Sequence, residues 1–167
     1  LYDNTTHTPG TKASWGFACM IEGGEKNILF DTGSDALILR QNAEALHMDL
    51  GRADMVVLSH NHGDHSKGMP AVLERKKGLR ILLPKDTPDT WMDTIKDAGN
   101  RPERVSAAMK IDPRVFLVPT EGNGVAEISL ALLTADGAMV ITGCAHPGVV
   151  HIVRQAGEVA GRKITAL

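Results

Sequence analysis

Three histidines and one aspartate lie within six residues of this chain, and side chains of both types can bind a metal ion. They are His60, His62, Asp64 and His65, and they include three of the seven histidines of the sequence. Imidazole nitrogens and carboxylate oxygens are ligands that zinc and other borderline divalent ions accept. Alternating residues of an extended turn face the same side, so His60 and His62 are placed to hold one ion. Asp64 and His65 are adjacent, point differently and can serve a second ion.

The elements before this cluster are predicted to bring it to the end of a strand. The apolar residues 55–58 predict a buried strand that ends at the histidines. Residues 17–21 and 27–31 predict a pair of strands, because the glycines of the turn between them accept positive φ. Apolar side chains at helical spacing predict a helix at 36–47, capped by Ser34 or Asp35. His47, at the end of this helix, is interpreted as structural because a cation suits the helix dipole there.

Helices and strands are predicted to continue after the cluster. We expect helices at 68–77 and 86–98, with Pro70 and Pro88 in their first turns, and a short strand at 80–83. Residues 99–113 are polar and have prolines near both ends. We expect irregular structure there, where a lid or a wall of a binding site could lie.

The second half of the chain is predicted to present a second group of candidate ligands. Residues 127–133 alternate apolar and polar side chains and pair with 139–142 as a hairpin, which carries Cys144 and His146 at its end. Pro147 is expected to open a helix that contains His151, and residues 163–167 to begin another strand. No histidine lies between His65 and His146, so His146 is the candidate ligand from this half. His151, inside the helix, is not expected to bind metal.

Two residues stay open at this point. The Cys144 thiolate would be a good zinc ligand, but cysteine is also a common buried hydrophobe. His7 lies in a loop marked by Pro9 and Gly10, where it could contact a substrate or simply be solvated.

The pattern His-x-His-x-Asp-His after an apolar strand resembles the metallo-β-lactamase superfamily of metal-dependent hydrolases. The turn Asp31-Thr32-Gly33 after residues 27–30 is similar to a second mark of that superfamily. The stretch Gly143-Cys144-Ala145-His146, with Trp15-Gly16-Phe17, resembles one subgroup. That subgroup is labelled 7,8-dihydropterin-6-yl-methyl-4-(β-D-ribofuranosyl)aminobenzene 5′-phosphate synthase-like.

The resemblance implies an α/β fold, an αββα sandwich of two mixed β-sheets with outer helices and the site at one edge. It implies a single domain over residues 1–167 and a structural role for Asp31, which would hydrogen-bond the histidine loop. Superfamily members run on to a late histidine beyond the last strand seen here. We therefore expect this chain to be a fragment, or the ordered part of a longer protein, incomplete at its C-terminus.

The chemistry expected of such a site is hydrolysis. One or two Zn²⁺ ions, or Mn²⁺ or Fe²⁺, would activate water, and Asp64 would bind metal, orient the nucleophile and pass a proton to the leaving group. Phosphoesters, lactones and amides are all candidate substrates. The alternatives are a mononuclear iron oxygenase acting on sulfur compounds and a metal-binding member without turnover. Di-iron reductases of the superfamily typically have glutamate where His62 stands, so His62 argues against that branch. The sequence contains no Gly-x-Ser-x-Gly motif, so a serine hydrolase is not indicated.

Composition narrows the class of protein but not its substrate. A length of 167 residues can bury one core, and 43% of the residues are hydrophobic, which is ordinary for a globular domain. A formal net charge of -2 gives no indication of nucleic acid or of an anionic membrane as partner. Two cysteines make no disulfide framework. We expect a small-molecule substrate and a cytoplasmic protein.

Overall fold

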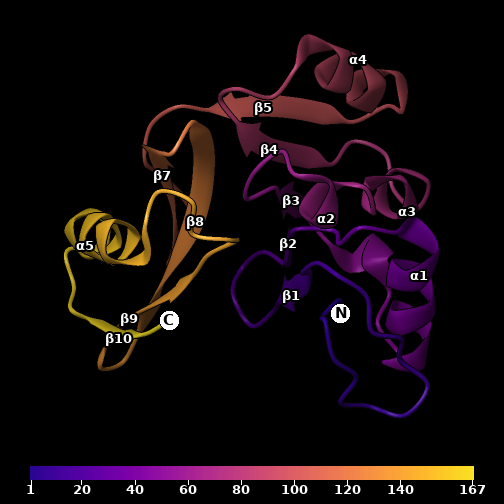
Figure 1. Cartoon of the computed structure of the whole chain (residues 1–167), viewed down its shortest axis with the longest axis horizontal. Helices are drawn as coiled ribbons and strands as arrows, with labels where there is room; N and C mark the ends of the chain where they lie inside the picture. Colours follow the sequence, from indigo (N-terminus) through magenta and orange to yellow (C-terminus); the bar gives the residue numbers. More distant parts are fainter.

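A computed structural model describes residues 1–167 and arranges them in four layers, with two five-stranded sheets between outer helices (Figure 1). The first half of the chain forms one sheet, in the order β1-β2-β3-β4-β5, and the second half forms the other, in the order β10-β9-β8-β7-β6. Both sheets are mixed, because β1 and β10 pair with their neighbours in the opposite sense to the other strands. The expected αββα sandwich is confirmed. The strands are β1 (Cys19–Ile21), β2 (Ile28–Phe30), β3 (Met55–Val57), β4 (Arg80–Pro84), β5 (Arg101–Val105), β6 (Met109–Asp112), β7 (Val115–Gly122), β8 (Val125–Thr134), β9 (Gly137–Ile141) and β10 (Ile164–Ala166).

Three apolar clusters hold the layers together. The first joins the outer face of the first sheet to the helices beside it, and the third joins the second sheet to α5. The middle cluster lies between the sheets, where Phe30 and Val57 of the first share one core with Leu117 and Leu130 of the second. The helices are α1 (Ala36–Ala45), α2 (Gly63–Ser66), α3 (Met69–Leu73), α4 (Asp89–Asp97) and α5 (Val149–Ala160).

Strand direction explains where a site can form. Strands β2, β3 and β4 are parallel, so their carboxyl ends meet at one edge of the first sheet. The end of β9 reaches the same edge, because the amide of Ile128 in the paired strand β8 donates a hydrogen bond of 2.7 Å to the carbonyl of Ser59. Loops from both halves of the chain therefore meet there.

The expectation of irregular structure at residues 99–113 is wrong. This segment contains β5 and β6, which form the outer edges of the two sheets. An edge strand needs only one side of its backbone paired, so it tolerates Pro102 and the charged side chains around it. The polar composition that suggested a loop is that of an edge strand, and the segment forms no lid.

Several helix boundaries also differ from the prediction. The helix expected at 68–77 is limited to α3, and α1 ends at Ala45, so that His47 follows it with a φ of 55°. Pro147 does not open α5, which begins at Val149 after Gly148. Residues 1–4 contribute a single antiparallel bridge, between Tyr2 and Ala18. Asp35 caps α1 as expected, accepting bonds from the amides of Leu37 and Ile38.

Asp112 links the two sheets at the end far from the histidines, and its removal should weaken this link. Its carboxylate accepts hydrogen bonds from the backbone amides of Glu25 and Lys26, in the turn between β1 and β2, and from that of Arg114. Although burial raises its pKa, these bonds outweigh that effect and leave the pKa of Asp112 below the usual value. We expect Asp112→Ala to lower the free energy of unfolding by about 1–3 kcal/mol in urea denaturation at neutral pH.

The same substitution should change how stability depends on pH. A carboxyl whose pKa is lower in the folded state stabilises fully above its unfolded pKa, about 3.9 for Asp, and less as the pH falls below that. The difference in stability between wild type and Asp112→Ala should therefore shrink in acid. A difference that stayed constant from pH 7 to pH 3 would contradict this assignment.

No helix of the chain has the length and apolar composition needed to span a bilayer.

Candidate metal centre

The histidine loop begins where β3 ends. The chain leaves this strand through bends at Ser59 and Asn61, and α2 then makes a single helical turn that holds Asp64 and His65. His60 is fully buried and His65 nearly so, whereas His62 is exposed. Gly16 lies against this turn. A Cβ at position 16 would lie 2.1 Å from the carbonyl oxygen of Asp64, so only glycine fits there.

Five side chains from two distant parts of the sequence converge on this loop. His60, His62 and His146 form one group whose candidate ligand atoms all lie within 4.8 Å of one another, and His60, His65 and Cys144 form another. His60 Nε2 lies 3.1 Å from His62 Nδ1, and His65 Nε2 lies 3.2 Å from the Cys144 sulfur. The structure thus brings His146 and Cys144 to the predicted cluster.

Asp64 borders the same cluster. Its Oδ2 lies 3.4 Å from Nε2 of His65, and its side chain is 21% exposed. A carboxylate in this place is close enough to share an ion with His65 and open enough to meet a small molecule.

Hydrogen bonds fix which nitrogen of each buried imidazole is free. The Ser59 hydroxyl donates to Asp31 Oδ2, so it has no proton left for His60 and must accept from His60 Nδ1 at 2.9 Å. His65 Nδ1 lies 2.6 Å from Asp31 Oδ2 and donates to that carboxylate. In both rings the unprotonated Nε2 therefore faces the cluster, which is the tautomer that a metal ligand needs.

Asp31 is the buried anchor of the loop, as the resemblance implied. It also accepts a hydrogen bond of 2.6 Å from the amide of Ser59, and its backbone has a φ of 59°. Burial raises the pKa of Asp31, while its hydrogen bonds to His65 and Ser59 oppose that effect. One carboxylate thus orients two candidate ligands through three hydrogen bonds.

The charges around the cluster favour a cation. Burial, followed by the charges of His65 and His62, lowers the pKa of His60 to about 3, so this ring stays neutral near pH 7 with its lone pair free. Burial lowers the pKa of His65 too, but the hydrogen bond and charge of Asp31 outweigh it and raise the pKa overall. Burial, and then the charge of Asp64, raises the pKa of the Cys144 thiol, which a bound cation would lower.

His146 provides the test of whether these residues fit a metal ion. Its Nε2 is buried and is the one buried side-chain nitrogen or oxygen atom of the chain that lacks a hydrogen-bond partner. Its ring centroid lies 4.9 Å from that of His60 and 4.7 Å from that of His62. An unpaired polar atom of this kind costs free energy unless something occupies its lone pair. The donor set of imidazoles, thiol and carboxylate suits zinc or a similar divalent ion.

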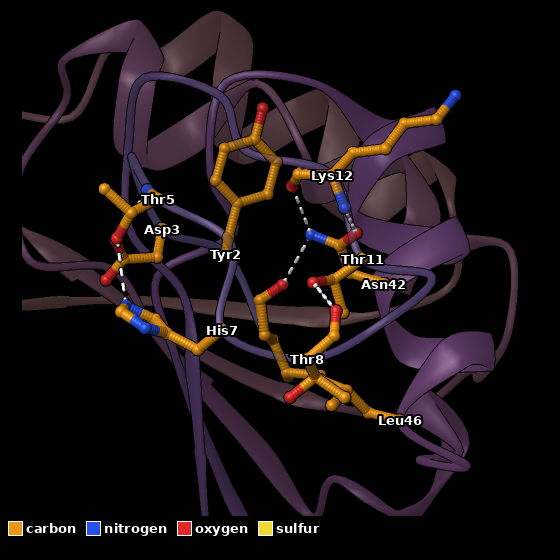
Figure 2. Close-up of a pocket in the computed structure, with 10 residues that line it drawn as sticks. Tyr2, Asp3, Thr5, His7, Thr8, Thr11, Lys12, Asn42 and Leu46 are labelled. Atoms are coloured by element: carbon orange, nitrogen blue, oxygen red, sulfur yellow. Dashed lines mark hydrogen bonds between the residues drawn. The ribbon is translucent and has the colours of Figure 1, made fainter.

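Other residues considered from the sequence lie away from this cluster. His7 is exposed and pairs with Thr5 at 2.9 Å in a pocket formed by the N-terminal loop and α1 (Figure 2). In the same pocket, the buried Asn42 side chain donates to the carbonyls of Leu1 and Lys12 and holds the loop against the helix. His151 is exposed on α5. Cys19 belongs to β1, and burial raises its pKa to about 12, so it is an inert thiol.

Two residues of the site were not singled out from the sequence. Ser59 precedes the histidine pattern, and its hydroxyl links Asp31 to His60 by hydrogen bonds to both side chains. Glu127 lies in β8 and accepts hydrogen bonds from the amides of Ala145 and His146. Its signal was a lone charged residue within the strand predicted at 127–133.

Comparison with known proteins identifies the family. Residues 26–157 match the family model described as a beta-lactamase superfamily domain. The chain belongs to the beta-lactamase superfamily. Solved structures of metallo-β-lactamase fold proteins agree: YhfI from Bacillus subtilis superposes with a TM-score of 0.60 at 14% identity, over 83% of this chain and 59% of that protein. Human tRNase Z, short form, gives a TM-score of 0.62 at 15% identity, over 92% of this chain and 71% of that one. These likenesses show the fold alone.

Two relatives of this superfamily member come from the archaeon Methanocaldococcus jannaschii. The protein named 7,8-dihydropterin-6-methyl-4-(beta-D-ribofuranosyl)-aminobenzene-5'-phosphate synthase is 26% identical, over 83% of this chain and 62% of the relative. An uncharacterized protein is 29% identical, over 96% of this chain and 75% of that protein. The chain thus spans less than two thirds of the named synthase. The resemblance to this subgroup is confirmed.

Proposed function

We propose that this chain carries the metal centre of a hydrolase, held by His60, His62 and His146 and by Asp64, His65 and Cys144. The observation that carries the proposal is the buried, unpartnered Nε2 of His146, whose ring lies beside those of His60 and His62 in one group of candidate ligands. His60 belongs to both groups of candidate ligands, so a second ion would depend on His65, Cys144 and Asp64. When bound, a divalent ion lowers the pKa of water to about 7 and polarises the oxygen under attack.

The side chains around the proposed ion would orient its ligands and move the proton. Asp31 and Ser59 keep Nδ1 of His65 and His60 protonated, so that Nε2 of each is available without rearrangement. Asp64, partly exposed beside His65, would orient the attacking water and carry its proton to the leaving group. Hydrolysis of phosphoesters, lactones or amides is consistent with these roles. The named archaeal relative is a synthase, so transfer to an acceptor other than water belongs in the same screen.

Elemental analysis of the full-length protein, as purified and after reconstitution, tests the proposal. About two zinc or manganese ions per chain would support a hydrolase with paired ions. A single bound iron, together with oxygen consumption when sulfur compounds are added, would favour the iron oxygenase over the hydrolase. No bound metal after reconstitution would overturn the metal centre altogether.

Removal of the metal should abolish turnover reversibly. We expect a chelator to suppress hydrolysis of any substrate found in the screen, and added Zn²⁺ or Mn²⁺ to restore it, because the proposed nucleophile is water activated by the ion. His62→Ala should weaken reconstitution, whereas His151→Ala, on the exposed face of α5, should leave it unchanged. Turnover that persists in the chelated protein would argue against the proposal.

A further inference from the structure

Glu127 is a buried carboxylate whose hydrogen-bond donors all come from the loop that carries Cys144 and His146. It is 1% exposed. Its Oε1 accepts from the Thr142 hydroxyl and from the amide of Ala145, and its Oε2 accepts from the amide of His146, each at 2.9 Å. No lysine or arginine pairs with it. A carboxylate buried in this way is retained only where amides and hydroxyls replace the water it has lost.

These hydrogen bonds hold the loop in a backbone conformation that it would otherwise avoid. Ala145 has a φ of 56°, a left-handed conformation that is unfavourable for any residue with a Cβ. Its amide is bound by Glu127 and its carbonyl accepts from Gly148 at 2.8 Å. In this conformation the amide of His146 points toward the same carboxylate and donates to it. The orientation of the His146 side chain therefore depends on Glu127.

Glu127 also stands where the two sheets meet. Its neighbour Ile128 donates to the carbonyl of Ser59, the residue before His60. Gly143 passes so close to this point that a Cβ there would lie 2.4 Å from the Ser59 hydroxyl and 3.1 Å from Glu127 Oε1. One segment of β8 therefore contacts both the loop that ends β3 and the loop that ends β9.

We propose that Glu127 is a positioning residue that sets Cys144 and His146 against His60, His62 and His65, and that it thereby determines metal affinity. The inference rests on the proposed metal centre and adds to it a residue that touches neither ion nor substrate. The negative charge of Glu127 also reaches the site, where it contributes to raising the pKa values of His65 and Cys144. A divalent ion would be favoured by the same charge.

Glu127→Gln tests the proposal with almost no change of shape. Glutamine keeps one acceptor oxygen, but its NH2 group cannot accept a hydrogen bond, so at least one of the three bonds from the loop is lost. We expect zinc to bind about 10–100-fold more weakly, measured by competition with a chromophoric chelator under conditions where the apo protein is folded. The visible spectrum of the Co²⁺ complex should change as well, because it reports the ligand geometry. Glu44→Gln, the same change on an exposed face of α1, is the matched control and should bind zinc as the wild type does.

The outcomes separate this inference from the proposed function. A wild type that binds no divalent ion would overturn both. A wild type that binds zinc, with Glu127→Gln equal to it in affinity and Co²⁺ spectrum, would overturn the role of Glu127 alone, even if the variant were less stable. If Glu127→Gln does not fold, Thr142→Val removes one donor to Glu127, together with the acceptor of the Ser129 hydroxyl, and should weaken zinc binding by about fivefold. Unchanged binding in that variant would also count against the proposal.

Discussion

Replacing Asp31 by alanine is expected to lower the free energy of unfolding by about 3–5 kcal/mol, which would remove much of the stability of a domain of this size. Asp31 is fully buried and is the acceptor for the amide and hydroxyl of Ser59 and for Nδ1 of His65. Alanine leaves these three donors without a partner in a place that water does not reach. It also adopts the φ of 59° less readily than aspartate does.

Urea denaturation of the apo protein measures this effect without any assumption about metal. Asp31→Asn should be destabilised less, because asparagine keeps the shape, one acceptor oxygen and the tolerance of positive φ. Asp93→Ala, at an exposed position of α4 where the aspartate pairs only with Lys96, is the control and should stay within about 0.5 kcal/mol of the wild type. If Asp31→Ala unfolds like that control, the hydrogen bonds of Asp31 do not anchor the loop.

The second large effect is expected in turnover rather than in stability. Asp64→Asn should lower kcat/KM by about 100–10,000-fold on the best substrate of the screen, because an amide can neither accept nor return a proton. The Asp64 side chain is 21% exposed and its Oδ2 lies 3.4 Å from Nε2 of His65, so the fold does not depend on its charge as it does on that of Asp31. The apo protein should therefore unfold much as the wild type does.

Metal content must be measured for each variant, since Asp64 is also a candidate ligand. Rates are compared per metal-loaded chain, with Asp97→Asn on the exposed end of α4 as a control of identical chemistry. Wild-type turnover by Asp64→Asn at equal metal content would show that this carboxylate moves no proton in the reaction. A variant that has lost both metal and activity would assign Asp64 to ion binding instead.

The elements that were predicted correctly are those with a local signal. The strand β3 is an uninterrupted apolar run, and the hairpin of β8 and β9 has a turn of small and polar residues between apolar ones. β5 and β6 were missed because they lie at the edges of their sheets. The conformation of such a strand is set by pairing with the neighbouring strand, and its polar composition resembles that of a loop. The single turn α2 was predicted as loop, since four residues carry too little periodicity to indicate a helix.

The sequence by itself determined which candidate ligands lie together in the histidine loop, because residue type and spacing are local properties. His60, His62, Asp64 and His65 lie within six residues, and no folding is needed to bring them near one another. Which distant residues join them was decided by tertiary structure. The sulfur of Cys144 reaches His65 across 79 positions of sequence only because the two sheets pack through one apolar core and β8 bonds to Ser59. Composition could not separate Cys144 from Cys19, nor Glu127 from an ordinary surface glutamate. The burial of Glu127 and the partners of Cys144 come from contacts between segments that are far apart in the chain, and such contacts leave little mark on the local pattern.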